Sequence, residues 1–254
     1  MANEQRRKEI LRELGLTPLW RAREAIPQER SAASAHAYPV EPQLGAVRDG
    51  EEDGDEARRS RILRLEWDEL EASVATCTAC PLCEGRTRTV FGVGDKNADW
   101  LYIGEGPGAQ EDATGEPFVG QAGKLLDNML AAIDLKRGHS VFIANIVKCR
   151  PPGNREPTHY EARQCEPYLA RQIDLIKPRL IIVLGKVAAQ NLLGTDAGIG
   201  SLRGKLHQHA GIPVIVTYHP AYLLRTPTAK AKAWEDLCFA RSTMRKLIPL
   251  QYSD

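Results

Sequence analysis

The sequence predicts an α/β fold in which helices flank a central, mainly parallel β-sheet, with a flexible N-terminal extension ahead of it. Short apolar runs at 100–103, 141–147 and 180–185 contain almost no polar residue, which is typical of strands buried on both faces. Segments with helical periodicity separate these runs, and such alternation indicates a parallel sheet covered on both sides. Ligands of these sheets bind beyond the carboxyl ends of the strands, so the loops 104–120, 145–155 and 217–225 are the candidate site.

The other helices and strands are predicted from the spacing of apolar residues and from glycines at element ends. Leu126, Met129 and Leu130 recur at helical spacing within 123–133, and Gly185 ends the apolar run before the next helix. We also expect helices at 62–75, 158–176, 186–193 and 228–247 and a strand at 214–218.

The N-terminal quarter differs from the rest in composition. Residues 5–24 can form one amphipathic helix, whereas 26–60 are rich in Ala, Ser, Pro, Gly and acidic residues, a composition typical of a flexible linker. Residues 1–70 hold 12 Lys and Arg against 15 Asp and Glu, and the remainder holds 22 against 18. We therefore expect an N-terminal helix and acidic linker over 1–61 and a working domain over 62–254 that tolerates a polyanionic partner.

The sequence contains no run near the roughly 20 apolar residues that a membrane span requires. The N-terminus also lacks the apolar core of a signal peptide. These features predict a cytoplasmic protein that makes no membrane contact, and we expect it to be a monomer. Cysteines in the cytosol bind metal or react more often than they form disulfides.

Four cysteines have the spacing of a metal or cluster site. Cys77 and Cys80 form a CxxC pair, Cys149 follows a predicted strand, and Cys165 lies on the next predicted helix. Four thiolates from two separated segments can hold zinc or an iron–sulfur cluster, and spacing alone does not separate the two. Cys83 extends the first pair to CxxCxxC and leaves the ligand set open, because a cysteine can also be a small buried apolar residue.

A glycine-rich turn, 104–108, follows the strand at 100–103. It lacks the spacing of a dinucleotide or P-loop motif, so a phosphate cradle is a poor fit. Glu105, Glu111 and Asp112 place carboxylates near Phe118, which suits a base or sugar pocket better than a phosphate pocket. The alternative is a solvated loop with Phe118 in the core.

A histidine loop follows the strand at 214–218. His219 comes at the ligand-binding edge of the sheet and is stiffened by Pro220. Leu223 and Leu224 follow in the same predicted loop, where two consecutive leucines must be covered by something.

Together, the segments GEGPGAQEDATGEPFVGQAG, ANIVKCRPPGNREP and YHPAYLLR, with CTAC and the later cysteines in order, closely resemble the iron–sulfur (type 4) uracil-DNA glycosylases. The resemblance covers about residues 64–248 and several ordered motifs. It implies the fold of that superfamily, uracil-containing DNA as partner, and hydrolysis of the uracil N-glycosidic bond as the first step of base-excision repair. It also implies a [4Fe–4S] cluster on Cys77, Cys80, Cys149 and Cys165.

The same resemblance assigns roles to individual residues. Glu105 and Gly106 would line the pocket, Phe118 would stack on the flipped base, and Asn154 would be a second polar residue of the rim. Asn145 would read the base, His219 would stabilise the leaving uracil, and Leu223 would fill the space that the base vacates.

Catalysis by a neutral histidine fits this chemistry, because a donor to a uracil carbonyl stabilises developing negative charge by about 3 kcal/mol. Other uracil-DNA glycosylases have a water-orienting aspartate where this chain has Gly106, so the general base is open, with Glu111 as the candidate. A non-catalytic, metal-stabilised nucleic-acid-binding module is the alternative function, and an iron–sulfur redox carrier is the third.

Overall fold

The computed structural model describes residues 49–247, and the predicted helix at 5–24 lies outside this range. A six-stranded sheet with the order β1-β3-β2-β4-β6-β5 forms its centre. β2, β3, β4 and β6 are parallel, and the short strands β1 and β5 pair antiparallel at the two edges. The strands are β1 Val93–Gly94, β2 Trp100–Gly104, β3 Val141–Asn145, β4 Leu180–Leu184, β5 Leu206–His209 and β6 Ile212–Thr217.

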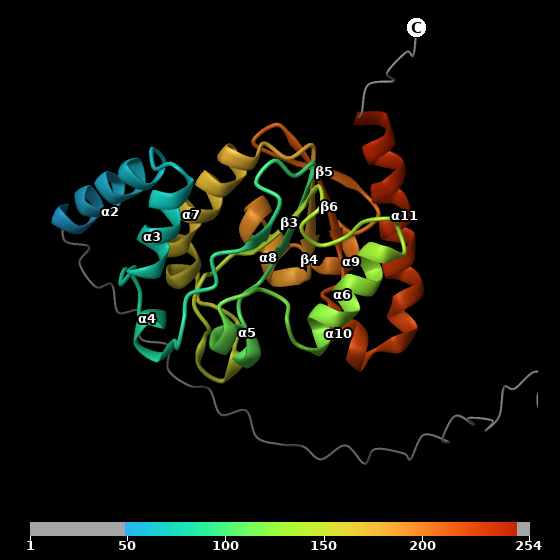
Figure 1. Cartoon of the computed structure of the whole chain (residues 1–254), viewed down its shortest axis with the longest axis horizontal. Coiled ribbons are helices and arrows are strands. Elements are labelled where there is room, and N and C mark those ends of the chain that lie inside the picture. The colour runs from blue at the N-terminus through green and yellow to red at the C-terminus, as the bar shows by residue number, and fades with distance from the viewer. Residues whose placement is uncertain (1–48, 248–254) are drawn as a thin grey trace, which may run out of the picture. The chain divides into compact units, whose positions relative to one another are not determined.

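Helices cover both faces of this sheet (Figure 1). The predicted α/β architecture is therefore confirmed. The longer helices are α2 Asp49–Ile62, α3 Trp67–Ala75, α6 Gln121–Ala131, α7 His159–Ile176, α8 Lys186–Leu193 and α11 Lys230–Leu247. The shorter ones are α4 Leu82–Gly85, α5 Ala109–Thr114, α9 Ile199–Leu202, α10 Pro220–Arg225, η1 Pro152–Asn154 and η2 Pro227–Ala229.

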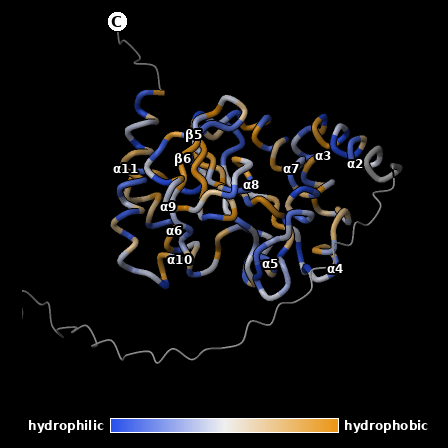
Figure 2. The backbone as a smooth tube through the Cα atoms, turned by 180° about the vertical axis from the view of Figure 1, so that it is seen from behind, coloured by the Kyte–Doolittle hydropathy of each residue, from blue (hydrophilic) through white to orange (hydrophobic). Residues whose placement is uncertain are grey.

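Alternate residues of each central strand enter different cores. In β2, Leu101 and Ile103 pack with α3, α7 and α8, whereas Trp100 and Tyr102 pack with α6, α10 and α11. Period-2 alternation with both faces apolar explains why the strands read as continuous hydrophobic runs. Figure 2 shows hydrophobic residues gathered in the central strands, with hydrophilic ones frequent on the outer helices.

Helix α7 begins where its sequence provides a capping box. Thr158 Oγ1 accepts from the Glu161 amide at 3.2 Å, and the Glu161 carboxylate accepts from the Thr158 amide at 2.7 Å. Arg155 also donates to that carboxylate, and these interactions lower the pKa of Glu161 to about 2 against the opposing effect of burial. The cap fixes the first turn of the helix that carries Cys165.

The acidic segment before residue 62 is helical, which differs from the predicted flexible linker. Helix α2, residues 49–62, includes residues 49–60 of the predicted flexible linker and crosses the boundary predicted between residues 61 and 62. Arg58 donates to the Gln164 carbonyl at 3.0 Å, Gln164 donates to Asp55 at 2.7 Å, and Arg59 pairs with Glu166. These contacts join α2 to α7, so the working domain begins before residue 62. The helix predicted at 62–75 is also shorter, since α3 starts at Trp67.

No helix in residues 49–247 is long and apolar enough to span a membrane.

Candidate functional site

Two predicted site residues, Asn145 and Phe118, meet around Gly104 at the carboxyl edge of the sheet. Gly104 ends β2 and pairs in register with Asn145, which ends β3. A Cβ atom on Gly104 would lie 2.5 Å from Asn145 Oδ1 and 2.6 Å from Cζ of Phe118, so this position accepts only glycine without rearrangement. β2 lies between β3 and β4, where the direction of chain connection reverses, and such switch points are where α/β sheets bind ligands.

Asn145 carries an unpaired polar atom. Its side chain is 1 % exposed, and Oδ1 is one of two buried side-chain polar atoms without a hydrogen-bond partner within residues 49–247. The backbone carbonyl of Asn145 is held by the buried amine of Lys148, which donates at 3.1 Å and also donates to Gln172 Oε1 at 2.6 Å. A buried acceptor left open on a fixed backbone indicates a position for a ligand donor.

The loop that presents Phe118 is strained and held at several points. Phe118 has φ +56°, which is unusual for a bulky residue. Arg137 donates to the carbonyls of Pro117 and Phe118 at 2.8 and 2.9 Å, while Glu111 Oε1 accepts from the amides of residues 119 and 120 at 3.0 Å each. A Cβ on Gly123 would lie 1.7 Å from the Phe118 carbonyl oxygen, so α6 approaches the loop closely. Arg137 and Gly123 were not identified from the sequence, which gives no local signal for them.

His219 faces Phe118 with its ring centroids 5.5 Å apart. It is the N-cap of α10, and its Nδ1 accepts from the Ala221 amide at 3.2 Å, which leaves the proton of the neutral ring on Nε2. Burial, and next the charge of Arg225, lower the pKa of His219 to about 4, although Glu111 opposes the shift. A pKa this low leaves the imidazole neutral at physiological pH, which is the form that the predicted role requires. Gly185 (φ +96°) lets the end of β4 approach, because a Cβ there would lie 2.9 Å from His219 Cβ.

Among the carboxyl groups at this edge of the sheet, Glu105 has the pKa that is shifted most. Burial, and next the nearby charge of Glu156, raise the pKa of Glu105 to about 7. The adjacent Gly106 packs against β3's continuation, since a Cβ on it would lie 2.7 Å from Val147 Cγ2. An aspartate at position 106 would not fit without a shift of Val147.

Three predicted roles need correction. Glu111 is engaged by the amides of the Phe118 loop, so it holds that loop rather than standing free as a base. Asn154 is exposed, and its Oδ1 accepts from Arg150 Nε at 2.7 Å. Leu223 lies in the helix α10, not in a loop, and at 1 % exposure it packs in the core and has no free side chain to insert into DNA. Phe118, at 7 % exposure, lies in the core, as the alternative for its loop expected.

The four predicted cysteine ligands gather in a second region, on the α3–α7 side of the sheet. They line one small cavity together with Cys83, Arg86, Lys148 and Tyr168. N–H groups point at three of their sulfur atoms: Arg86 Nη1 lies 3.2 Å from Cys149 Sγ, the Lys148 amide lies 3.3 Å from Cys165 Sγ, and Arg58 Nη2 lies 3.7 Å from Cys77 Sγ. Cationic and amide donors aimed at sulfur are the surroundings that a thiolate-held anionic group requires.

This cavity is small, about 10 Å³, and five cysteines line it, Cys83 included. Within residues 49–247, no three His, Cys, Asp or Glu side chains converge closely enough to hold a single metal ion. Zinc–sulfur bonds of about 2.3 Å would need tightly grouped thiolates, whereas an iron–sulfur cluster spreads its ligands around a cube. Thiolates are the donors that an iron–sulfur cluster takes, so the residues around this cavity fit such a group by donor type.

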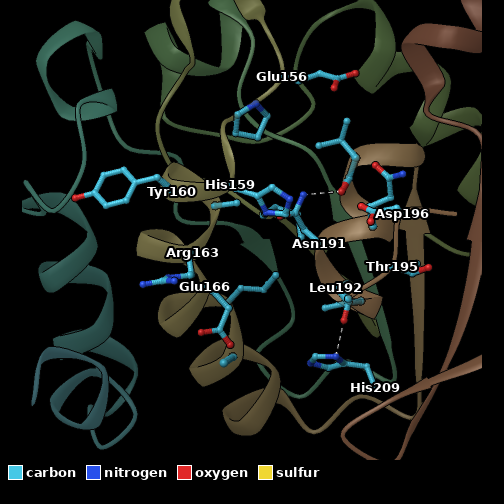
Figure 3. A pocket seen from close by; sticks show the side chains of 18 of the residues that line it. Glu156, His159, Tyr160, Arg163, Glu166, Asn191, Leu192, Thr195, Asp196 and His209 are labelled. Atoms are coloured by element: carbon cyan, nitrogen blue, oxygen red, sulfur yellow. Dashed lines mark hydrogen bonds between the residues drawn. The ribbon is translucent and has the colours of Figure 1, made fainter. Parts of the chain in front are cut away.

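A larger cavity, of about 870 Å³, lies apart from both regions (Figure 3). It is a groove between α7 and α8 that is lined by polar and apolar side chains, among them His159, Asn191 and His209. None of the predicted site residues lines it. Glu156, whose charge helps to raise the pKa of Glu105, is among its lining residues. The predicted site residues therefore lie outside this groove, around the unpaired Oδ1 of Asn145 and the strained backbone of Phe118.

Comparison with known proteins identifies the family of this chain. Residues 91–238 match the family model of the uracil DNA glycosylase superfamily. Type-4 uracil-DNA glycosylase from Pyrobaculum aerophilum is 42 % identical over 181 residues, which covers 68 % of this chain and 92 % of the relative. The type-4 enzymes of Archaeoglobus fulgidus (41 % identity, 66 % of this chain and 88 % of the relative) and Thermotoga maritima (42 %, 68 % and 92 %) are similarly related. With Asn145, Phe118 and His219 gathered at the sheet edge, these matches show that the chain belongs to the type 4 branch of the uracil-DNA glycosylase superfamily.

Proposed function

We propose that this protein removes uracil from DNA by hydrolysing the N-glycosidic bond, leaving an abasic site for base-excision repair. The observation that carries the assignment is the buried Oδ1 of Asn145, which has no hydrogen-bond partner. It lies beside Phe118, whose ring in turn faces the neutral His219. Buried amide acceptors are otherwise almost always paired, so this atom is available to a base.

The amide of Asn145 selects uracil by its hydrogen-bonding pattern. Oδ1 accepts from the ring N3–H of uracil, and the amide nitrogen can donate to the adjacent carbonyl. Cytosine presents a ring acceptor and an exocyclic donor at these positions, so both contacts would fail. Phe118 supplies the apolar surface beside the base, and its loop is held by Arg137 and Glu111.

His219 stabilises the departing base. Cleavage breaks the C1′–N1 bond, and its electron pair leaves with uracil. The Nε2–H of His219 donates to a uracil carbonyl as this charge develops, an effect worth about 3 kcal/mol for one oriented donor. Because the ring is neutral, its donation involves no desolvated cation in the pocket.

Glu105 is the carboxylate that we assign to the sugar side of the reaction. When ionised it can orient the water that adds to C1′, accept the proton that this water loses, and stabilise positive charge on the deoxyribose. A pKa near 7 makes it a competent base near neutral pH. We therefore assign the base role to Glu105 in place of Glu111.

We propose that Cys77, Cys80, Cys149 and Cys165 hold the [4Fe–4S] cluster implied by the type 4 pattern. When bound, the cluster provides an inorganic crosslink between the segment after α3 and the β3–α7 segment. The N–H groups of Arg58, Arg86 and Lys148 support the thiolates. The hydrolysis described above uses no electron transfer.

Residues 49–247 contain every residue of this scheme, and we propose that they act as a monomer on DNA in the cytoplasm. Size-exclusion chromatography with light scattering measures the oligomeric state.

An oligonucleotide with one uracil tests the function. The protein should convert it to a site that alkali cleaves, and an oligonucleotide with cytosine at the same position should stay intact. If folded, cluster-loaded protein binds the uracil strand and never releases the base, the alternative of a non-catalytic binding module replaces this proposal.

A further inference from the structure

We infer that Cys83 is a reserve ligand of the cluster site, which takes the place of Cys80 as the fourth thiolate when Cys80 is lost. This inference rests on the proposed [4Fe–4S] cluster and adds a fifth cysteine to the four that the type 4 pattern assigns. The exchange replaces one iron–sulfur bond by another. Because the thiolate is the ligand form of cysteine, Cys83 gives up its proton, Cys80 takes one, and no electron is transferred.

Cys83 shares its surroundings with the four assigned ligands. It lines the same cavity of about 10 Å³ as they do. Cys238, the remaining cysteine of the chain, is exposed and lines no part of this cavity. A site that takes four thiolates therefore has five cysteines around it.

The turn that carries Cys80 and Cys83 places them on the same side. The Cys83 amide donates to the Cys80 carbonyl at 3.2 Å, a hydrogen bond that spans three residues. Side chains three residues apart eclipse each other in turns of this kind. Leu82 between them is 2 % exposed and packs in the same core cluster as Cys149, so the turn is held against the cavity.

Side-chain donors distinguish the half-buried cysteines of this cavity. Cys77 is half-buried, and the Arg58 guanidinium points at its sulfur. Cys80 and Cys83 are also half-buried, but no guanidinium or amine within residues 49–247 donates to either sulfur. Charge-assisted hydrogen bonds are the stronger ones, so a thiolate without one is less firmly held. The fourth position is therefore the one at which two cysteines can exchange.

A reserve thiol has a use at this position. Oxidation of a cysteine follows its thiolate character and its exposure, so a half-buried ligand is more open to damage than a buried one. Cys149 and Cys165 are buried, whereas Cys80 is not. A second thiol on the same turn keeps the set of four thiolates complete when Cys80 is lost.

Cluster content tests the inference without any DNA. Cys80→Ala, whose new side chain has no donor atom, should keep more than about half of the iron, the sulfide and the visible absorbance of the wild type, because Cys83 completes the set. Removing Cys80 and Cys83 together should abolish all three. Cys80→Ala combined with Cys238→Ala is the matched control, since it also removes two cysteines, and it should equal Cys80→Ala alone.

Alkylation with iodoacetamide, read by mass spectrometry, locates the ligand without the double variant. In Cys80→Ala, loading with iron and sulfide should slow the alkylation of Cys83 about tenfold relative to the cluster-free protein, because a thiolate bound to iron is not a free nucleophile. In the wild type, loading should protect Cys80 and leave Cys83 reactive. Cys83→Ala should load fully and then lose its absorbance in air several-fold faster than the wild type.

Three results would overturn the inference. They are loss of the cluster from Cys80→Ala as complete as from the double variant, equal alkylation of Cys83 in the loaded and cluster-free forms of Cys80→Ala, and wild-type decay in air for Cys83→Ala. A wild type that binds no iron and sulfide would instead refute the proposed cluster. Uracil excision enters none of these readouts, so the proposed enzymatic function is tested separately.

Discussion

The cysteine cavity and the proposed base pocket lie on opposite faces of the same sheet. They differ in whether their polar atoms have hydrogen-bond partners. In the cysteine cavity, N–H groups from Arg86, Arg58 and Lys148 approach three sulfur atoms. In the pocket, Asn145 Oδ1 has no partner and Phe118 has a strained backbone. The first arrangement suits the proposed permanent cluster, and the second suits the proposed binding of a transient ligand. Chemistry is therefore expected in the region with the open acceptor, not in the one with more reactive residue types.

Lys148 links the two regions. Its backbone amide points to Cys165 Sγ, and its amine holds the carbonyl of Asn145. Loss of the cluster should consequently affect the pocket through the position of β3, while loss of a pocket residue should leave the cluster intact.

The largest expected effect is that of removing a cluster ligand. Cys149→Ser should abolish the visible absorbance and lower the melting temperature, because a crosslink between two segments is lost. Cys238→Ser, at an exposed cysteine outside the cavity, should change neither quantity. A Cys149→Ser protein with full absorbance would remove that cysteine from the ligand set.

Asn145→Ala should reduce excision about 100-fold with the cluster absorbance unchanged, since it removes two hydrogen bonds to the base in a buried site. Asn154→Ala is the matched control, because its amide is exposed and pairs with Arg150. Steady-state kinetics should show a much smaller change for Asn154→Ala. Equal losses in the two variants would mean that burial does not distinguish their roles.

The pH dependence of excision separates the role of Glu105 from that of His219. Its pKa is raised to about 7, so activity that needs the carboxylate should rise from pH 6 to pH 8. The pKa of His219, lowered to about 4, predicts no loss from histidine protonation over that range. Glu105→Gln should flatten the kcat/KM profile and lower its alkaline plateau. Protonated Glu105 is the form favoured by folding, so stability should fall from about pH 4.5 to 7 in the wild type and less in Glu105→Gln.

The smallest effect is expected from Arg86→Ala. Arg86 donates to Cys149 Sγ and to the Cys77 carbonyl, at 3.2 and 2.7 Å. Its loss should speed the decay of the visible absorbance in air a few-fold, because one charge-assisted hydrogen bond contributes about 1 kcal/mol. The freshly loaded enzyme should still be active. An unchanged decay rate would show that this donor does not protect the cluster.

Much of the fold was predictable, because buried parallel strands are continuous apolar runs and Gly185 marks a strand end. The antiparallel edge strands β1 and β5 were not predicted, since they are short and only half-buried. Helix α2 was missed because its sequence is acidic and poor in apolar residues. Only its last residue, Ile62, is a core residue among those of α2 whose burial is described, and polar contacts join the helix to α7, more than 100 residues away.

The sequence motifs predicted which residues belong to the candidate site. They did not predict which of those side chains are buried or already hydrogen-bonded. The residues of the pocket and the cysteines were identified by resemblance, and the neutral state of His219 agrees with its surroundings. Which of two adjacent leucines is buried depends on the start of α10, and whether Glu111 is free depends on amides eight and nine residues later. Both are properties of the folded backbone.

The central claim is that a neutral His219 stabilises uracil as it leaves the pocket. Free uracil released in a single turnover, measured by chromatography for the wild type and for His219→Ala, tests it most directly, with His139→Ala at an exposed histidine as control. We predict that His219→Ala releases uracil about 100- to 1,000-fold more slowly while binding uracil-containing DNA and retaining the cluster absorbance. Release at the wild-type rate by His219→Ala would contradict the account.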